Sequence, residues 1–206
     1  MLTEDPAQTL ILNAAKACYL HLGVAKTTAA DIAREAGVSR ATLYRRFPSH
    51  GEIFLAVLAR DSWEMVADCE KRLSGIEDPA EHMIEGILYV LDEIVRRPLH
   101  AHLFTESSRS WVLSQTMAAE NLHQMCLQML HAMPGLNLSS SHYAETRVAY
   151  MAEWVLRTII SYAIAPSHVA RNRDAMRELL RTTLEPSVRA LLGSADPGIR
   201  DVTPIR

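Results

Sequence analysis

Glycine, aromatic residues and long apolar runs are all scarce in this sequence. Its 206 residues include eight glycines and 6% aromatic residues, whereas alanine, leucine and methionine are abundant. This composition favours helices, and no run of alternating polar and apolar residues indicates a strand. No stretch of 18 apolar residues exists, so we expect no membrane span. The sequence therefore predicts an all-α fold.

Cysteine is also rare, with three residues at wide spacing: Cys18, Cys69 and Cys126. Their odd number and spacing match neither a metal site nor a disulfide pattern, and a reducing compartment is the simplest interpretation. The opening residues, MLTEDPAQTL, contain acids and lack the basic segment of a secretory signal. We therefore expect a cytoplasmic protein with no cofactor and no metal site.

Positive charge is concentrated at one end of a chain whose formal charge is −3. Residues 1–60 contain seven lysines and arginines against five acids, a net charge of +2, which leaves −5 for the remainder. This asymmetry indicates that the first part of the chain binds a polyanion and that the rest does not.

Capping residues divide the first 50 residues into three helices. The predicted N-caps are Asp5, Thr28 and Ser39. Gly23 and Gly37 end the first and second helices, and the third helix extends to about residue 47.

The remainder predicts longer helices and a loose tail at 193–206. Their expected spans are 49–75, 79–97, about 99–107, 112–133, 141–165 and 170–192. Pro186 should kink or restart the last of them. The helix at 79–97 carries two adjacent apolar stripes and should be buried on most of its surface. These stripes are Met83, Ile87, Val90 and Ile94, and Ile84, Leu88, Leu91 and Val95.

The segment GVSRATLYRRFPSH, residues 37–50, has one apolar and one polar face when drawn as a helix. Leu43 and Phe47 point in the same direction and should enter the core. The outer face and its edges then carry a small residue, two hydroxyl groups and three arginines: Arg40, Ala41, Thr42, Tyr44, Arg45 and Arg46.

Such a helix suits the major groove of DNA. A small residue lets the backbone approach, arginine pairs with guanine, and hydroxyl groups bind phosphates. With the short helix before it and the turn at Gly37, it completes a helix-turn-helix unit. The alternative is an ordinary solvent-exposed amphipathic helix. The combination of cap, glycine turn and apolar pair favours DNA binding.

The run TTAADIAREAGVSRATLYRRFPSHGEIFLAVL, with ILNAAKACYLHLG before it, resembles the DNA-binding region of the TetR (tetracycline-repressor-like) family over about residues 10–58. The resemblance implies a helix-turn-helix DNA-binding domain at 1–50 and a helical effector-binding and dimerisation domain at 51–206. It also implies that Thr28 and Tyr44 hold phosphates and that Arg46 reaches the backbone or a base edge. The residues that would face bases are Arg40, Ala41, Thr42 and Arg45. Ser39 and His50 complete the predicted DNA-binding set.

His50 departs from the family pattern, which often has lysine near this position. A neutral histidine would contribute less to phosphate binding, and a charged one would make binding sensitive to pH. The alternative is an exposed loop residue without such a role.

The resemblance further implies a homodimer on an inverted-repeat double-stranded operator, with the last two long helices forming the dimer contact. Small and branched residues alternate between Ala144 and Ala163, which would allow close helix packing. Ordinary core within one chain is the alternative.

A small-molecule effector would occupy an apolar pocket among the middle helices. The candidate lining residues are Trp63, Met65, Met83, Ile87, Phe104, Trp111, Met125, Met129 and Trp154. Each of them is equally open to a plain core role. Polar contacts to the effector could come from His82, His123, Gln124, Tyr150 or Arg157.

Other functions have weaker support. Two histidine and cysteine pairs, His100 with His102 and His123 with Cys126, would suit a metal sensor, and Cys69 or Cys126 a thiol sensor. No nucleophile elbow, phosphate-binding glycine loop or H-E-x-x-H motif indicates an enzyme or a catalytic residue. The sequence therefore predicts an effector-responsive transcription regulator, most simply a repressor.

Overall fold

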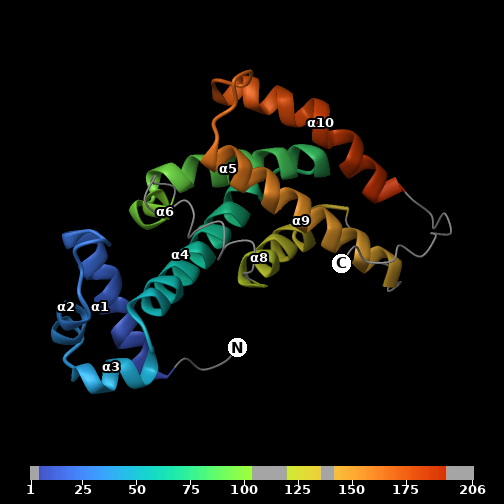
Figure 1. Ribbon diagram of the computed structural model, residues 1–206. Coiled ribbons are helices and arrows are strands. Elements are labelled where there is room, and N and C mark those ends of the chain that lie inside the picture. Colours follow the sequence, from blue (N-terminus) through green and yellow to red (C-terminus); the bar gives the residue numbers. More distant parts are fainter. Residues whose placement is uncertain (1–4, 104–119, 136–141, 194–206) are drawn as a thin grey trace, which may run out of the picture. The chain divides into compact units, whose positions relative to one another are not determined.

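The structure, a computed structural model, describes residues 5–103, 120–135 and 142–193. These residues form helices and turns, and none of them lies in a strand, which confirms the all-α prediction. The helices are α1 (Pro6–Leu22), α2 (Ala29–Glu35), α3 (Arg40–Arg46), α4 (His50–Leu73), α5 (Pro79–Arg96), α6 (Pro98–Leu103), α8 (Glu120–His131), α9 (His142–Ile164) and α10 (Arg173–Gly193) (Figure 1).

The chain divides into two compact units, and each is described by itself. The first unit comprises residues 1–68 and 92–118, and the second comprises residues 69–91 and 119–206. Two helices, α4 and α5, contribute residues to both units. The predicted domain boundary after residue 50 remains a prediction.

The first unit has one apolar core shared by five helices. α1 packs against α2 and α6, and α2 packs against α3. Each of α1, α2, α3, α4 and α6 contributes a fully buried side chain: Ile11, Ile32, Leu43, Ile53 and Leu99. Because α2 and α3 have only seven residues each, they are too short to be stable alone and depend on this shared core.

The predicted ends of the first three helices are confirmed. Asp5, Thr28 and Ser39 each accept a hydrogen bond from a backbone N–H in the first turn of the helix that follows. Gly23 and Gly37 have φ angles of 85° and 65°, which residues with a side chain rarely adopt. These local signals set the ends of α1, α2 and α3 through neighbours only a few residues away.

A buried carboxylate, that of Asp61 in α4, ties other helices of the first unit to α4. Lys16 Nζ of α1 lies 2.8 Å from Asp61 Oδ1. Arg97 Nη1 and His100 Nδ1 lie 3.6 and 3.2 Å from Asp61 Oδ2. Burial by itself would raise the pKa of Asp61, but Lys16, His100 and Arg97 lower it below its usual value. The carboxylate is therefore charged at neutral pH and links α1, α4 and α6.

The second unit is formed by the end of α4, most of α5, and α8, α9 and α10. α8 packs along α9. The most deeply buried apolar residues of the second unit include Ile84, Ile87, Val148, Ala152, Leu180, Leu184 and Val188. A row of ion pairs joins α10 to the first turns of α5: Arg173 and Arg177 with Glu85, Arg181 with Glu81, and Arg189 with Asp78.

Two expectations for the longer helices are wrong in part. Val95 ends one of the predicted buried stripes of α5, yet 76% of it is exposed, because no described helix covers the last turn on that side. Pro186 does not restart the last helix, since α10 continues from Arg173 to Gly193. Leu184 and Val188, fully buried on either side of the proline, fix both halves.

Some predictions concern residues outside the described part of the chain. These are the tail at 194–206 and the helical segments expected at 104–107 and 112–119. Within the described part, no helix is both long enough and apolar enough to cross a membrane.

Replacing Leu43 tests how strongly α3 depends on the apolar core of the first unit. Leu43→Ala should lower the free energy of unfolding by about 2–5 kcal/mol, because it removes fully buried methyl groups and leaves a cavity. Leu20→Ala makes the same change on a side chain that is 51% exposed, and should cost less than about 0.5 kcal/mol. Urea unfolding followed by circular dichroism measures both. Equal losses would contradict the role of Leu43.

Candidate functional site

The α2–turn–α3 segment has the geometry of a helix-turn-helix unit. Gly37 and the Val38 N–H, which donates to Ala33 O at 3.0 Å, end α2 and turn the chain. Ser39 then caps α3: its Oγ accepts from the Thr42 N–H at 3.1 Å and lies 3.0 Å from Thr42 Oγ1. The orientation of α3 is therefore set by backbone geometry on both sides of the turn.

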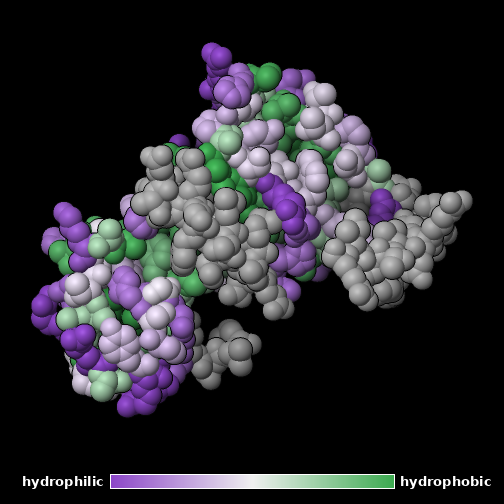
Figure 2. Space-filling model, viewed as in Figure 1, coloured by the Kyte–Doolittle hydropathy of each residue, from purple (hydrophilic) through white to green (hydrophobic). Residues whose placement is uncertain are grey.

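The two faces of α3 are those expected from the sequence. Leu43 and Phe47 are 0% and 5% exposed and belong to the core. Thr42 is half-buried, and the exposed residues are Arg40, Ala41, Tyr44, Arg45 and Arg46. Figure 2 shows strongly hydrophilic residues gathered over the α2–α3 end of the first unit, at lower left. Neither Arg40 nor Arg45 forms an ion pair with a described residue, so both charges are available to a ligand.

Thr28 is already engaged in the free protein. Its hydroxyl donates to Asp31 Oδ2 at 2.6 Å and accepts from the Asp31 N–H at 3.2 Å. Arg34 Nη2 lies 2.7 Å from Asp31 Oδ1. Hydrogen bonds from Thr28 and the charge of Arg34 lower the pKa of Asp31, which is therefore ionised. A phosphate at Thr28 would have to displace this internal acceptor.

Arg46 likewise has an internal partner. Its Nη1 forms an ion pair with Asp5 Oδ2, while Asp5 Oδ1 caps α1 through the Ala7 N–H at 3.1 Å. The sequence assigned Arg46 to a phosphate or base edge and missed this pairing, because Asp5 and Arg46 are far apart in the chain. The pair is partly exposed, so its strength is modest and salt-sensitive.

His50 is directed into the first unit. It is the first residue of α4 and is half-buried, so the exposed-loop alternative is wrong. Its ring contacts Tyr19 edge to face, with Nε2 3.4 Å from the Tyr19 hydroxyl, and it also bonds to the Thr27 backbone. Burial lowers the pKa of His50 below 6.5, which the bond to Thr27 offsets only in part. The ring is therefore neutral at pH 7.

Ser62, His100 and Asp61 stand in the order of a hydrolase triad, which the sequence did not indicate. Ser62 Oγ lies 2.9 Å from His100 Nε2 and also donates to the Leu58 carbonyl at 2.8 Å. His100 Nδ1 is 3.2 Å from Asp61, although the direction of its N–H does not give a hydrogen bond. All three side chains are buried, with exposures of 4–6%, so substrate has no access to Ser62. The arrangement supports packing between α4 and α6.

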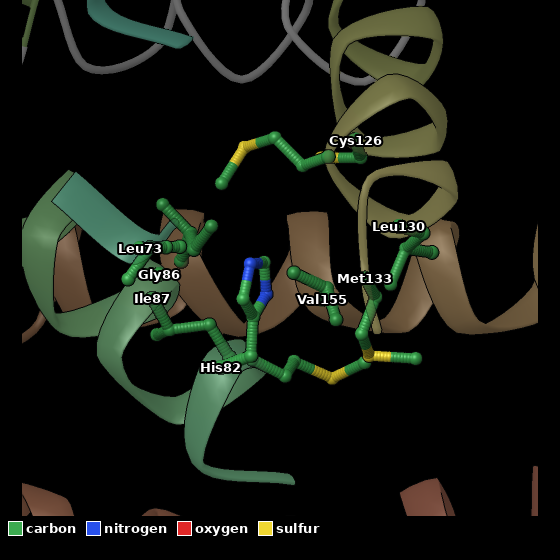
Figure 3. Close-up of a pocket in the computed structure, with 11 residues that line it drawn as sticks. Leu73, His82, Gly86, Ile87, Cys126, Leu130, Met133 and Val155 are labelled. Atoms are coloured by element: carbon green, nitrogen blue, oxygen red, sulfur yellow. The ribbon is translucent and has the colours of Figure 1, made fainter. Parts of the chain in front are cut away.

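The second unit contains a cavity with about 390 Å³ of space free of protein atoms, part of it open to solvent. Four helices supply its walls, and Figure 3 shows their side chains around the space. The lining residues are Leu73 of α4; His82, Met83, Gly86 and Ile87 of α5; Cys126, Met129 and Leu130 of α8, with Met133 just beyond it; and Val155 and Ile159 of α9.

The predicted pocket residues divide into three groups. Met83, Ile87 and Met129 line this cavity, whereas Trp63, Met65, Met125 and Trp154 are not among its lining residues. Phe104 and Trp111 lie outside the described residues. Periodicity alone could not make this division, because core and cavity wall have the same composition.

Two of the lining residues, His82 and Gly86, have features that are visible in the sequence. The sequence indicates His82 as one of several residues that could give a polar contact to an effector, and it offers no reason to choose among them. Gly86 interrupts the interior of α5, where glycine costs helix stability. A Cβ there would lie 3.4 Å from Leu73 Cδ1 and 3.6 Å from Met129 Cε. The glycine therefore keeps α5 close to its neighbours at the cavity.

The residues proposed for metal or thiol sensing have other environments in the structure. His100 bonds to Ser62, and His102 packs edge to face on Phe54. Within the described residues, no group of three histidine, cysteine or acidic side chains converges. Cys18, Cys69 and Cys126 are buried, and burial raises the pKa of each, to about 12 for Cys69 and Cys126. Such thiols carry little of the reactive thiolate form.

Residues 11–57 match the family described as bacterial regulatory proteins, tetR family. The uncharacterised HTH-type transcriptional regulator Rv2250c of Mycobacterium tuberculosis is 36% identical over 95 residues. The match covers 45% of this chain and 48% of the relative, so it spans about half the length of that protein. The family match at residues 11–57 includes α2, the turn and α3.

Solved structures extend the likeness of fold to most of the chain. The TetR family repressor AlkX from Dietzia sp. strain DQ12-45-1b, implicated in biodegradation of n-alkanes, has a TM-score of 0.70 at 15% identity, covering 92% of this chain and 98% of AlkX. Thermus thermophilus FadR, a TetR family repressor in complex with lauroyl-CoA, has a TM-score of 0.58 at 18% identity, covering 94% and 100%.

Residues 11–57, which include the helix-turn-helix unit, thus match the DNA-binding region of the tetR family. At these identities the two structures establish a shared fold, whereas what they bind is said of them alone.

Lowering the pH from 7.5 to 6.5 should not raise DNA affinity through His50. The pKa of His50 lies below 6.5, so the ring stays largely neutral across this interval and adds no charge for a phosphate. Fluorescence polarisation with labelled duplex at the two pH values measures the effect. His50→Gln, which removes the titrating group, should show the same profile as the wild type.

The opposite result would indicate a phosphate contact by His50. A rise in wild-type affinity at pH 6.5 that disappears in His50→Gln would show that the ring charges at the phosphate backbone. The contact implied by the family resemblance would then hold.

Proposed function

We propose that this protein is a homodimeric repressor that binds an inverted-repeat operator on double-stranded DNA in the cytoplasm and is released by a small, largely apolar effector. The observation that carries the proposal is the outer face of α3. There a small residue, Ala41, lies among the exposed Arg40, Tyr44 and Arg45, while Leu43 anchors the opposite face. Unpaired arginines beside a small residue suit the floor of a major groove.

Base and phosphate contacts fall to different residues in this proposal. Arg40, Ala41, Thr42 and Arg45 face the bases, and Tyr44 holds a phosphate. Thr28, Ser39 and Arg46 serve at the DNA backbone or a base edge, whereas His50 is turned toward Tyr19. The ion pairs of Asp31 and Asp5 support a binding step in which DNA phosphates replace internal carboxylates at Thr28 and Arg46.

A dimer follows from the need to contact two half-sites about 34 Å apart, one helical turn of DNA. The exposed aromatic residues of α9 support it. Tyr150 and Trp154 are 66% and 41% exposed and lie one turn apart on the same face. The alternating small and branched residues of α9 do not offer such a surface, because Ala152, for example, is 0% exposed within its own chain.

The effector site in this proposal is the cavity of the second unit. Its apolar wall supports an apolar ligand, in keeping with the acyl compound named for the Thermus regulator. α4 supports a coupling route, because it supplies Leu73 to the cavity and His50 and Ile53 to the first unit as one uninterrupted helix. An effector that tilts α4 would move the helix-turn-helix units of the two protomers out of register with the two half-sites. It can do so only by binding one conformation more tightly than the other.

An operator selected from a random duplex pool provides the first test. Arg40→Ala should weaken binding by about 1–3 kcal/mol, since it removes a base contact. Tyr44→Phe should cost about 0.5–1.5 kcal/mol through one lost hydrogen bond. Arg72→Ala, at an exposed arginine in the last turn of α4, is the matched control and should bind like the wild type. Unchanged affinity for Arg40→Ala and Tyr44→Phe would overturn the assignment of α3.

Assembly is tested by light scattering, which should give twice the chain mass of 23.0 kDa. Tyr150→Glu combined with Trp154→Glu should give monomers with reduced operator affinity, because charge is disfavoured in an apolar contact. Val95→Glu places the same charge on an exposed apolar residue of α5 and should leave the dimer intact. A wild-type monomer at micromolar concentration would refute the proposed dimer.

A further inference from the structure

The cavity of the second unit contains a single strongly polar side chain. Of its eleven lining residues, nine are aliphatic, methionine or glycine, and the other two are Cys126 and His82. Burial raises the pKa of Cys126 to about 12, so it is a neutral thiol and a weak hydrogen-bonding group. Among the described residues that line the cavity, His82 is thus the one that can make a strong directional contact with a ligand.

His82 lacks a hydrogen-bond partner among the described residues. Only 7% of it is exposed, and its single recorded hydrogen bond is that of its backbone N–H to the Asp78 carbonyl. Figure 3 shows the ring extending from α5 into the space between Leu73 and Val155. The imidazole can therefore form a hydrogen bond with a group that enters the cavity.

Among the described residues, charged and polar groups on the helices around His82 have other partners. On α5, Glu81 pairs with Arg181 and Glu85 with Arg173 and Arg177 of α10. On α8 and α9, Gln128 bonds to Glu70, and His123 lies 4.0 Å from Glu153. With no acid acting on it, burial alone lowers the pKa of His82 below 6.5. The ring is neutral at pH 7, with one donor and one acceptor nitrogen.

A neutral imidazole in an apolar wall selects among ligand classes. A carboxylate or phosphate would lose its hydration without gaining a cation, since the described residues that line the cavity include no lysine or arginine. A ligand amine would likewise find no acid there. A hydroxyl group both donates and accepts, so it matches either tautomer of the ring.

The methionines narrow the class further. Met83, Met129 and Met133 all line the space. Their flexible thioethers adapt to a ligand and make favourable contacts with aromatic edges. An aromatic ring is therefore a better occupant than a saturated chain of equal size.

We propose that the cavity binds an uncharged, alkyl-substituted phenol whose hydroxyl group hydrogen-bonds to the ring of His82. The inference rests on the proposed function only in taking this cavity as the effector site. The methionines and aliphatic residues enclose the apolar body, and His82 orients it.

Three probes of matched shape test the proposal with the full chain by isothermal titration calorimetry at pH 7.5: 4-propylphenol, 4-propyltoluene and 4-propylbenzoate. Wild-type protein should bind the phenol about tenfold more tightly than the toluene, the effect of one net hydrogen bond. The benzoate should bind more weakly than both. Equal affinity for phenol and toluene, tighter binding of the benzoate, or no binding of the phenol would overturn the proposal.

Variants at His82 assign the preference to that ring. His82→Leu should remove the preference by weakening the phenol about tenfold while leaving the toluene unchanged. His82→Gln keeps a donor and an acceptor and should retain most of the preference, which guards against a general effect of substitution. Gly86→Val crowds the wall near Leu73 and Met129, and should weaken phenol and toluene alike. A preference that survives in His82→Leu would overturn the role of His82.

The effector function is judged by a separate readout. Release of the operator by 4-propylphenol, measured by fluorescence polarisation, tests whether occupancy of the cavity acts on DNA binding. His82-dependent binding of the phenol without release would uphold the ligand class and refute the cavity as the effector site. Release by some other compound, without any phenol preference, would do the reverse.

Discussion

The charge of Asp61 is the constraint on which the first unit depends. A carboxylate with 6% exposure is stable only if cations compensate it, and here they are Lys16 of α1 and Arg97 after α5. The ring of His100 in α6, whose pKa is lowered by burial, lies beside them. Burial of this group therefore requires these helices to meet α4 at one point. Loss of any one cation would leave charge uncompensated in the core. Helix α4 is thus held in the first unit by electrostatic interactions as well as by apolar packing.

The DNA-facing surface shows a different balance, since part of its positive charge is neutralised internally. Arg46 faces Asp5, and Thr28 donates to Asp31, whereas Arg40 and Arg45 pair with no described residue. Contacts to the backbone would then begin as an exchange of one anion for another, which lowers their net contribution. Contacts to bases carry no such penalty. A surface built in this way favours sequence-specific over nonspecific binding.

Helix α4 contributes residues both to the cavity of the second unit and to the core of the first, which is the basis of the proposed route for regulation. Leu73 lies at the last turn of α4 and His50 at the first. Rigid helices transmit displacement, so a ligand against Leu73 can bias the far end of α4 if it favours one of two conformations. His82, which has no side-chain hydrogen bond with a described residue, lines the same cavity, so in our proposal it connects the chemistry of the ligand to this movement.

The sequence by itself determined the local features of this protein. Asp5, Thr28, Ser39, Gly23 and Gly37 fixed the first three helices and the turn between α2 and α3, because capping and positive φ involve neighbours only a few residues away. The tertiary structure decided what depends on distant residues. It directs His50 toward Tyr19, pairs Arg46 with Asp5, exposes Val95, and separates the cavity residues Met83 and Met129 from the buried Met125. Helical periodicity shows which face is apolar, whereas only packing shows whether that face meets another helix, a cavity or solvent.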